Sequence, residues 1–298
     1  MNESVIASLT RTRRDRVRTL LDGLFAVALF VATLVGVVVL GAMIWSILDR
    51  GWARFAEDPV GFLTSYSSRR ASQAGVRAGV VGSALLGVLV GVIAFPVGVG
   101  AALYLEEFAR PGKLRSFIDA NISNLAGVPS VVYGLLGLAV FVRFLGMGPS
   151  LLAGALTLSL MSLPIIIVTT REALKTVPES MREASLALGA TTWQTVRRQV
   201  LPAAMPGTLT GSILALSRAI GETAPLIVIG AAVSIFSTPH SLGDPFSALP
   251  LMTFTWVKRP QAEFREVAAA ASLVLLGLLL ALNSVAIFLR NRFTVKWQ

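Results

Sequence analysis

Six mostly apolar stretches divide the chain, and each is close to the length that crosses a lipid bilayer. A transmembrane helix needs about 20 consecutive, predominantly apolar residues. The stretches cover residues 23–48, 80–105, 125–142, 151–170, 209–235 and 267–289. The third is the shortest and contains Pro129. The pattern predicts an all-α integral membrane protein with six transmembrane helices.

The first stretch is set apart from the others. It follows a basic tail and is longer than the roughly 7–15 apolar residues of a signal peptide, so it predicts a retained helix. A polar segment, residues 49–77, then precedes the second stretch. We therefore expect a five-helix domain over residues 75–290. Residues 1–74 would hold a tail, the first helix and an external loop, and residues 291–298 a second tail.

Composition supports a membrane protein and indicates its orientation. Apolar residues make up 54% of the chain and charged residues 14%, against about 25% charged in soluble domains. The net charge of +10 would suggest nucleic acid in a soluble protein, but basic residues also collect in cytoplasmic loops. The tails and the loops on their side contain 16 Lys and Arg, and the other loops contain 9. We expect a cell-membrane protein with both termini cytoplasmic and no nucleic-acid partner.

Several kinds of chemistry are excluded by residue type. The chain has no cysteine, which rules out disulfides and thiolate chemistry, and its one histidine, His240, lies in a predicted loop. A zinc site with two histidines on one helix is therefore impossible, and we expect no metal site. A membrane enzyme would need a nucleophile with its base or a metal cluster, and the sequence offers neither.

The polar segment at residues 171–206 has strong local signals. Thr176 and Glu179 have the spacing of a capping box, with Pro178 in the first turn of a short helix. Gly189 suits the left-handed residue that ends this helix. Thr191 and Gln194 form a second capping box, and we expect the second short helix to stop at Pro202.

This segment resembles the EAA loop of ABC importer permeases of the MetI-like type. The residues that match are Glu183, Ala184, Ser185, Gly189, Leu201 and Pro202. Ser185 stands where the pattern usually has alanine, and Gln199 where it has an apolar residue. The resemblance implies a coupling helix that docks on an ATPase subunit.

The chain has no motif for hydrolysing ATP itself. The phosphate-binding loop G-x-x-x-x-G-K-[ST] is absent, since the only Gly-Lys pair, Gly112-Lys113, is followed by leucine. We therefore expect a transporter subunit that is not an enzyme and binds no cofactor. ATP and Mg²⁺ would belong to a separate ATPase chain.

Two ionisable residues, Arg218 and Glu222, lie well inside the apolar stretches. Each costs about 2.5–3.5 kcal/mol at bilayer depth, and their spacing places them on one helix face. Pro225 cannot donate to the carbonyl of Gly221, so we expect a weakened helix beside a glycine that allows close approach. Transporters bind substrate at broken helices of this kind, which predicts a substrate path here. A purely structural ion pair is the alternative.

The charge pair favours a protonated oxyanion. A guanidinium group matches such an anion with two parallel hydrogen bonds. The neighbouring carboxylate would repel a fully deprotonated anion and accept a hydrogen bond from one that retains a proton. Phosphate is partly protonated near neutral pH and sulfate is not, so the pair would favour phosphate.

Two segments resemble PstA-type permeases of the phosphate ABC importer, namely residues 124–134 and 218–226. The resemblance implies a phosphate importer in which the partners of this chain are a PstC-type permease, two ATPase subunits, an extracytoplasmic phosphate-binding protein and membrane lipid. It implies a substrate path with the residues Arg218, Gly221, Glu222 and Thr223. Pro129 and Pro225 would break the helices near that path. Importers of sulfate, molybdate or phosphonate, and an ion-coupled secondary transporter, remain alternatives.

Overall fold

The computed structural model describes residues 13–231 and 237–293. The start of the basic tail, the end of the predicted fifth span at 232–235 and the C-terminal residues 294–298 lie outside the described residues. The described part is helical, with one isolated antiparallel bridge between Ser150 and Pro245. The chain divides into two compact units, Met1–Asp49 and Arg50–Gln298. This division falls earlier than the boundary expected at residue 74.

The first unit contains most of helix α2 (Arg13–Glu57). Most of its large apolar side chains, such as Leu24, Phe30 and Val37, are exposed. An exposed apolar surface of this length is stable in lipid and not in water. The helix therefore has the character of a transmembrane segment over its whole apolar stretch.

The second unit is built on four long helices, α4 (Arg77–Leu103), α7 (Leu151–Lys175), α10 (Leu201–Gly221) and α13 (Glu263–Phe293). Small residues let these helices approach closely, as membrane helices commonly do. An added Cβ at Gly98 of α4, for example, would lie 2.7 Å from Ile166 of α7. Over the described residues, five helices are long and apolar enough to cross a membrane, or six if one bent pair counts as a span. The all-α membrane fold is confirmed.

The third predicted span is not a straight helix. Helix α5 (Lys113–Ala126) meets α6 (Ser130–Gly137) and its π-helical extension η3 (Leu138–Phe144) at 105°. Pro129 causes the break, since the residue before a proline avoids helical geometry. Across the bend, the Tyr133 hydroxyl donates to the Leu125 carbonyl at 2.8 Å. The single helix expected at 125–142 was wrong, and a braced corner takes its place.

The fifth span also differs from expectation at both ends. It does not stop and restart at Pro202, because a helix continues from Thr192 to Gly221 through a π-helical turn, η4 (Val196–Val200). In that turn the Leu201 N–H bonds to the Val196 carbonyl, five residues back, so the helix passes a proline intact. At the other end, helix α10 stops at Gly221 and a separate short helix, α11 (Ala224–Val228), follows.

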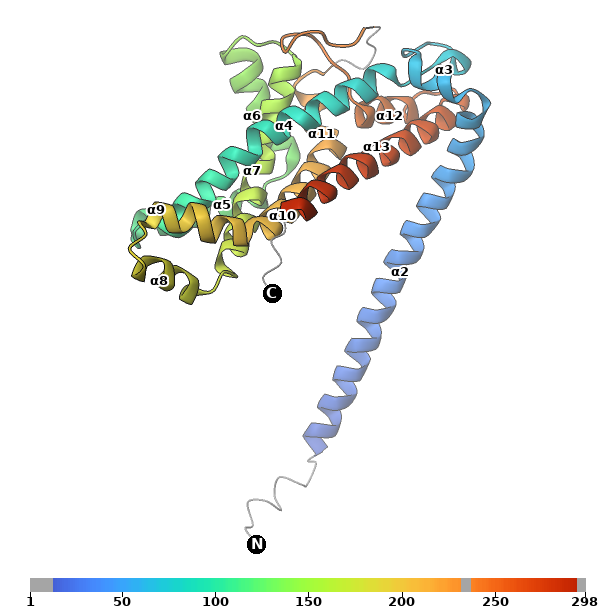
Figure 1. The fold of residues 1–298 in the computed structure, drawn as a ribbon. Helices are drawn as coiled ribbons and strands as arrows, with labels where there is room; N and C mark the ends of the chain where they lie inside the picture. Colours follow the sequence, from blue (N-terminus) through green and yellow to red (C-terminus); the bar gives the residue numbers. More distant parts are fainter. Residues whose placement is uncertain (1–12, 232–236, 294–298) are drawn as a thin grey trace. The chain divides into compact units, whose positions relative to one another are not determined.

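Helices α12 (Leu249–Val257) and α3 (Pro59–Thr64) were not predicted from the sequence. Helix α12 has 9 residues, too few for a transmembrane span. Its Trp256 is buried with Phe264 and with Phe62 of α3, beside the 3₁₀ turn η1 (Ala71–Gln73). In Figure 1, α3 and α12 lie near the start of α4, whereas α8 and α9 lie toward the opposite end.

The contact between α6 and α11 gives a testable prediction. An added Cβ at Gly134 of α6 would lie 2.8 Å from the Pro225 Cα, which cannot move away without shifting the backbone. We expect Gly134→Ala to destabilise the fold by about 1–3 kcal/mol through overpacking. The measurement is the thermal unfolding midpoint in detergent. Gly100→Ala is the control, since nothing lies within 4 Å of that position. Equal midpoints for both variants would contradict the close contact.

Candidate functional site

The segment expected to dock on an ATPase folds as two short helices. Helix α8 (Glu179–Ala187) is followed by Gly189, whose φ of +84° is left-handed, and then by α9 (Thr192–Thr195). The capping box of Thr191 and Gln194 is confirmed in both hydrogen bonds. The box expected at Thr176 is wrong, because its hydroxyl donates to the Ala173 carbonyl and closes α7 instead.

The motif residues of this segment present an open surface. Glu183 and Ala184 are exposed, and so is Leu188, at 90% of its full area. Exposed apolar side chains grouped among polar ones mark interaction surfaces. The hydroxyl of Ser185, which replaces the usual alanine, lies 2.9 Å from that of Thr195 and links α8 to α9. The serine that replaces the usual alanine at position 185 therefore links the two short helices of the segment.

Leu201 and Pro202 lie half-buried inside the continuous helix from Thr192 to Gly221. This helix has 30 residues and is about 45 Å long at 1.5 Å per residue. The two groups of predicted site residues are therefore not brought together. Glu183, Ala184 and Ser185 belong to α8, which precedes this helix, whereas Arg218 and Gly221 lie at its C-terminal end.

The predicted substrate residues surround the end of α10. The Arg218 Nε atom lies 3.6 Å from the Glu222 Oε1 atom, so the two side chains pair as expected. Arg218 is nevertheless 57% exposed, and nothing lies within 4 Å of an added Cβ at Gly221. A charged side chain at bilayer depth faces a cavity or another protein, not lipid. The guanidinium is accessible to a ligand, which a closed structural pair would not be.

The backbone beside this pair is irregular. Glu222 is extended, and Thr223 occupies the N-cap of α11 without a capping bond from its side chain. Pro225 is buried in α11 against Gly134 of α6. Pro129, at the N-cap of α6, forms the second break. The two helix breaks therefore belong to neighbouring helices, although Pro129 itself is exposed.

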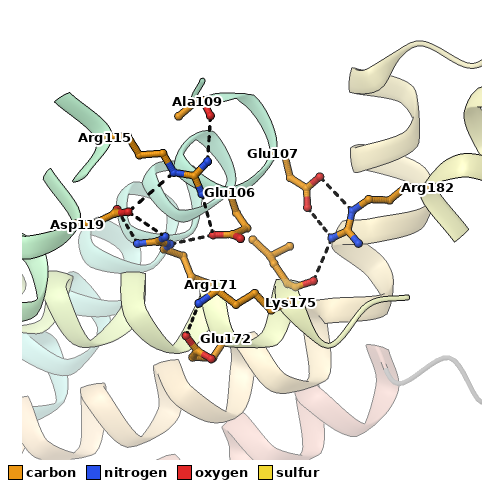
Figure 2. A network of polar contacts seen from close by, with 10 residues as sticks. Glu106, Glu107, Ala109, Arg115, Asp119, Arg171, Glu172, Lys175 and Arg182 are labelled. Carbon is orange, nitrogen blue, oxygen red and sulfur yellow. Dashed lines mark hydrogen bonds and ion pairs between the residues drawn. The ribbon is translucent and has the colours of Figure 1, made fainter. Parts of the chain in front are cut away.

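A cluster of ion pairs was missed in the sequence. It joins the π-helical turn η2 (Tyr104–Phe108), which ends α4, to α5, α7 and α8, as Figure 2 shows. Its members are Glu106, Glu107, Arg115, Asp119, Arg171 and Arg182. The adjacent glutamates at the end of an apolar stretch were the only signal. Hydrogen bonding to Glu107 raises the pKa of Arg182 above its ordinary value, so this guanidinium stays charged at physiological pH.

Metal chemistry finds no support in the described ranges. Over those residues, no group of three or more His, Cys, Asp or Glu side chains is arranged to hold a metal ion. His240 is exposed, and its backbone N–H donates to the Asp244 carboxylate at 2.7 Å.

Comparison with known proteins identifies the family. Residues 94–295 match the model of the binding-protein-dependent transport system inner membrane component. The chain belongs to this family. The phosphate transport system permease protein PstA 1 of Mycobacterium tuberculosis is 35% identical over 94% of this chain and 90% of its own length. The probable ABC transporter permease protein YqgI of Bacillus subtilis is 38% identical over 56% of each chain.

Solved structures of ABC transporters share the fold. A bacterial ABC transporter that imports the acidic polysaccharide alginate aligns over 93% of this chain with a TM-score of 0.63 and 15% identity. The MetNI methionine transporter aligns over 74% of this chain and 96% of its own, with a TM-score of 0.56 and 22% identity. The chain is thus a multi-pass membrane permease subunit and not an enzyme, and ATP hydrolysis belongs to a separate subunit.

The left-handed turn at Gly189 gives a testable prediction about docking of the ATPase subunit. Gly189→Val forces a branched side chain into a conformation that costs about 1–3 kcal/mol, so α8 and α9 should lose their relative placement. We expect at least several-fold less ATPase subunit to copurify with the variant. Gly112→Val is the control, because Gly112 has an extended φ of 171° and open space around it. Equal recovery of the ATPase with both variants would refute a docking role for this turn.

Proposed function

We propose that this chain is the PstA-type permease of an ATP-driven, binding-protein-dependent importer of inorganic phosphate. It would form the translocation path with a PstC-type permease, above two ATPase subunits, and receive phosphate from an extracytoplasmic binding protein. The observation that carries the proposal is the accessible guanidinium of Arg218 beside Glu222, at the broken end of a membrane-spanning helix. The similarity to a phosphate permease of M. tuberculosis along most of the chain supports it.

The geometry suits an anion that keeps one proton. Arg218 offers hydrogen-bond donors in a planar fork, which fits a tetrahedral oxyanion. Glu222, 3.6 Å away, accepts a hydrogen bond from a protonated anion and repels one without a proton. A phosphate group has a second pKa of about 6, so part of it carries that proton near neutral pH. Sulfate lacks it.

Energy for transport would enter at the other end of the same helix. In this proposal ATP and Mg²⁺ bind only the ATPase subunits. The movement of those subunits is transmitted to α8 and α9. The helix from Thr192 to Gly221 then carries that movement over about 45 Å to the charge pair. Gly221, Glu222 and Thr223 lie where this helix ends, since regular α-helix stops at Gly221.

Membrane orientation is part of the proposal and can be tested directly. With both termini and α8 in the cytoplasm, Ser180 is internal and Gln73 is external, and both side chains are exposed. Because the chain has no cysteine, Ser180→Cys and Gln73→Cys each introduce one unique thiol. In intact cells, a membrane-impermeant maleimide should label position 73 alone, and position 180 only after lysis. The reverse pattern would overturn the orientation.

Substitution of the charge pair tests the substrate role. Hydrogen bonds to charged groups contribute about 1.5–3 kcal/mol, so Arg218→Gln should lower phosphate uptake by roughly ten-fold or more. Uptake of labelled phosphate by vesicles containing the assembled transporter is the measurement. Arg265→Gln, at an exposed arginine outside the path, is the control and should transport normally.

The double variant Arg218→Gln with Glu222→Gln separates a binding role from a structural one. It removes both charges, so any cost of an unpaired charge disappears. A structural ion pair would regain transport in the double variant. A guanidinium that binds the anion would not be replaced, and uptake should stay low. Recovery to the original rate, at equal protein in the membrane, would show that the pair only joins helices.

A further inference from the structure

Arg182 attaches helix α8 to the end of α4 and to the last turn of α7. Its Nη2 atom lies 2.8 Å from the Glu107 Oε1 atom, and its Nε donates to the other carboxylate oxygen at 3.3 Å. The same guanidinium donates to the carbonyls of Val177 at 2.8 Å and Leu174 at 3.1 Å. The contact is largely shielded, since the Glu107 side chain is 8% exposed. One side chain therefore connects three helical elements.

Arg171 makes the neighbouring junction. It pairs with Asp119 of α5 at 2.7 Å and with Glu106 of η2 at 3.1 Å. Arg115 lies against both of these carboxylates. Glu106 and Glu107 are consecutive in one π-helical turn, so the two junctions share the same backbone (Figure 2). Through that turn, α8 is attached to α5 as well as to α4 and α7.

These contacts differ from the ion pairs of an exposed surface. Arg182 is the partner of the Glu107 carboxylate, which is 8% exposed, so removal of Arg182 leaves a shielded charge without that partner. Nearby, Lys175 pairs with Glu172 at 2.8 Å, but their side chains are 49% and 65% exposed. Exposed pairs contribute little to stability because water and salt screen them. Lys175 is therefore a matched control on the same segment.

We propose that Arg182 and Glu107 are positioning residues for energy coupling, which hold α8, η2 and α5 together as one moving body. This inference rests on the proposed importer function. Helix α5 leads through the braced corner at Pro129 into α6, which packs on α11 next to Thr223. Movement of the docking segment would thus reach the charge pair by a second route, in addition to the helix from Thr192 to Gly221.

A distance measurement tests this attachment without reference to the substrate. Spin labels at Ser116→Cys on α5 and Ser180→Cys on α8 report the separation of the two helices in the complete transporter, since both positions are exposed and the chain has no native cysteine. We expect one narrow distance distribution with the original residues and with Lys175→Ala, and a broad one with Arg182→Ala. An unchanged distribution in Arg182→Ala would overturn the proposal.

The coupling ratio tests the consequence. Phosphate moved per ATP hydrolysed should fall by about five-fold or more in Arg182→Ala and in Glu107→Ala, while ATPase subunits still copurify. The double variant should be no worse than either single one, because both remove the same contact. Glu107→Gln keeps the side-chain shape and should give a smaller loss of phosphate moved per ATP. It keeps the proposal testable if the alanine variants fold poorly.

The outcomes separate this proposal from the assigned function. If the transporter moves no phosphate but Arg182→Ala still broadens the distance distribution, the phosphate assignment is refuted and the proposed role of Arg182 stands. Losses of coupling that add in the double variant would show that Arg182 and Glu107 act separately, and would overturn the attachment.

Discussion

The bilayer tolerates neither an unpaired charge nor an unpaired backbone group, and this constraint explains most of the structure. Charged side chains in the second unit gather at helix ends, where they pair with one another or reach water. Two helix breaks depart from the rule, at Gly127–Pro129 and at Glu222–Thr223, and Arg218 lies beside the second. Irregular backbone at membrane depth is stable only where it is buried in protein or lines a cavity. The same constraint that shapes the helices therefore supports the proposed position of a polar path at these breaks.

The helix from Thr192 to Gly221 connects the proposed path to the surface expected to meet the ATPase. A π-helical turn lets it run past Pro202, so a displacement of α9 is carried along a stiff element and not absorbed in a loop. The ion pairs of Arg171 and Arg182 tie the docking segment to α5, whose corner leads to the same place. Two connections of different kinds would thus reach the proposed anion site.

The sequence predicts features that depend on nearby residues or on long apolar runs. The apolar stretches identified the membrane class, and Gly189 and the Thr191–Gln194 capping box were correctly placed because their chemistry is local. Prolines were harder to interpret. Pro129 and Pro225 stand at the starts of helices that follow a break, whereas the helix passes Pro202 after a π turn, and Pro96 and Pro164 lie inside α4 and α7. Arg182 and Glu107 are 75 residues apart, and only folding brings them together. Helix α12 is too short for its apolar residues to be recognised as a separate element.

The central claim is that an arginine–glutamate pair at the end of α10 selects a protonated tetrahedral anion. Competition during ATP-driven uptake tests it most directly, with the complete transporter in vesicles, labelled phosphate outside and an excess of unlabelled sulfate. The account predicts that sulfate leaves phosphate uptake unchanged and that unlabelled phosphate suppresses it. Suppression by sulfate equal to that by phosphate would contradict the role assigned to Glu222, and ATP-independent uptake would contradict the importer itself.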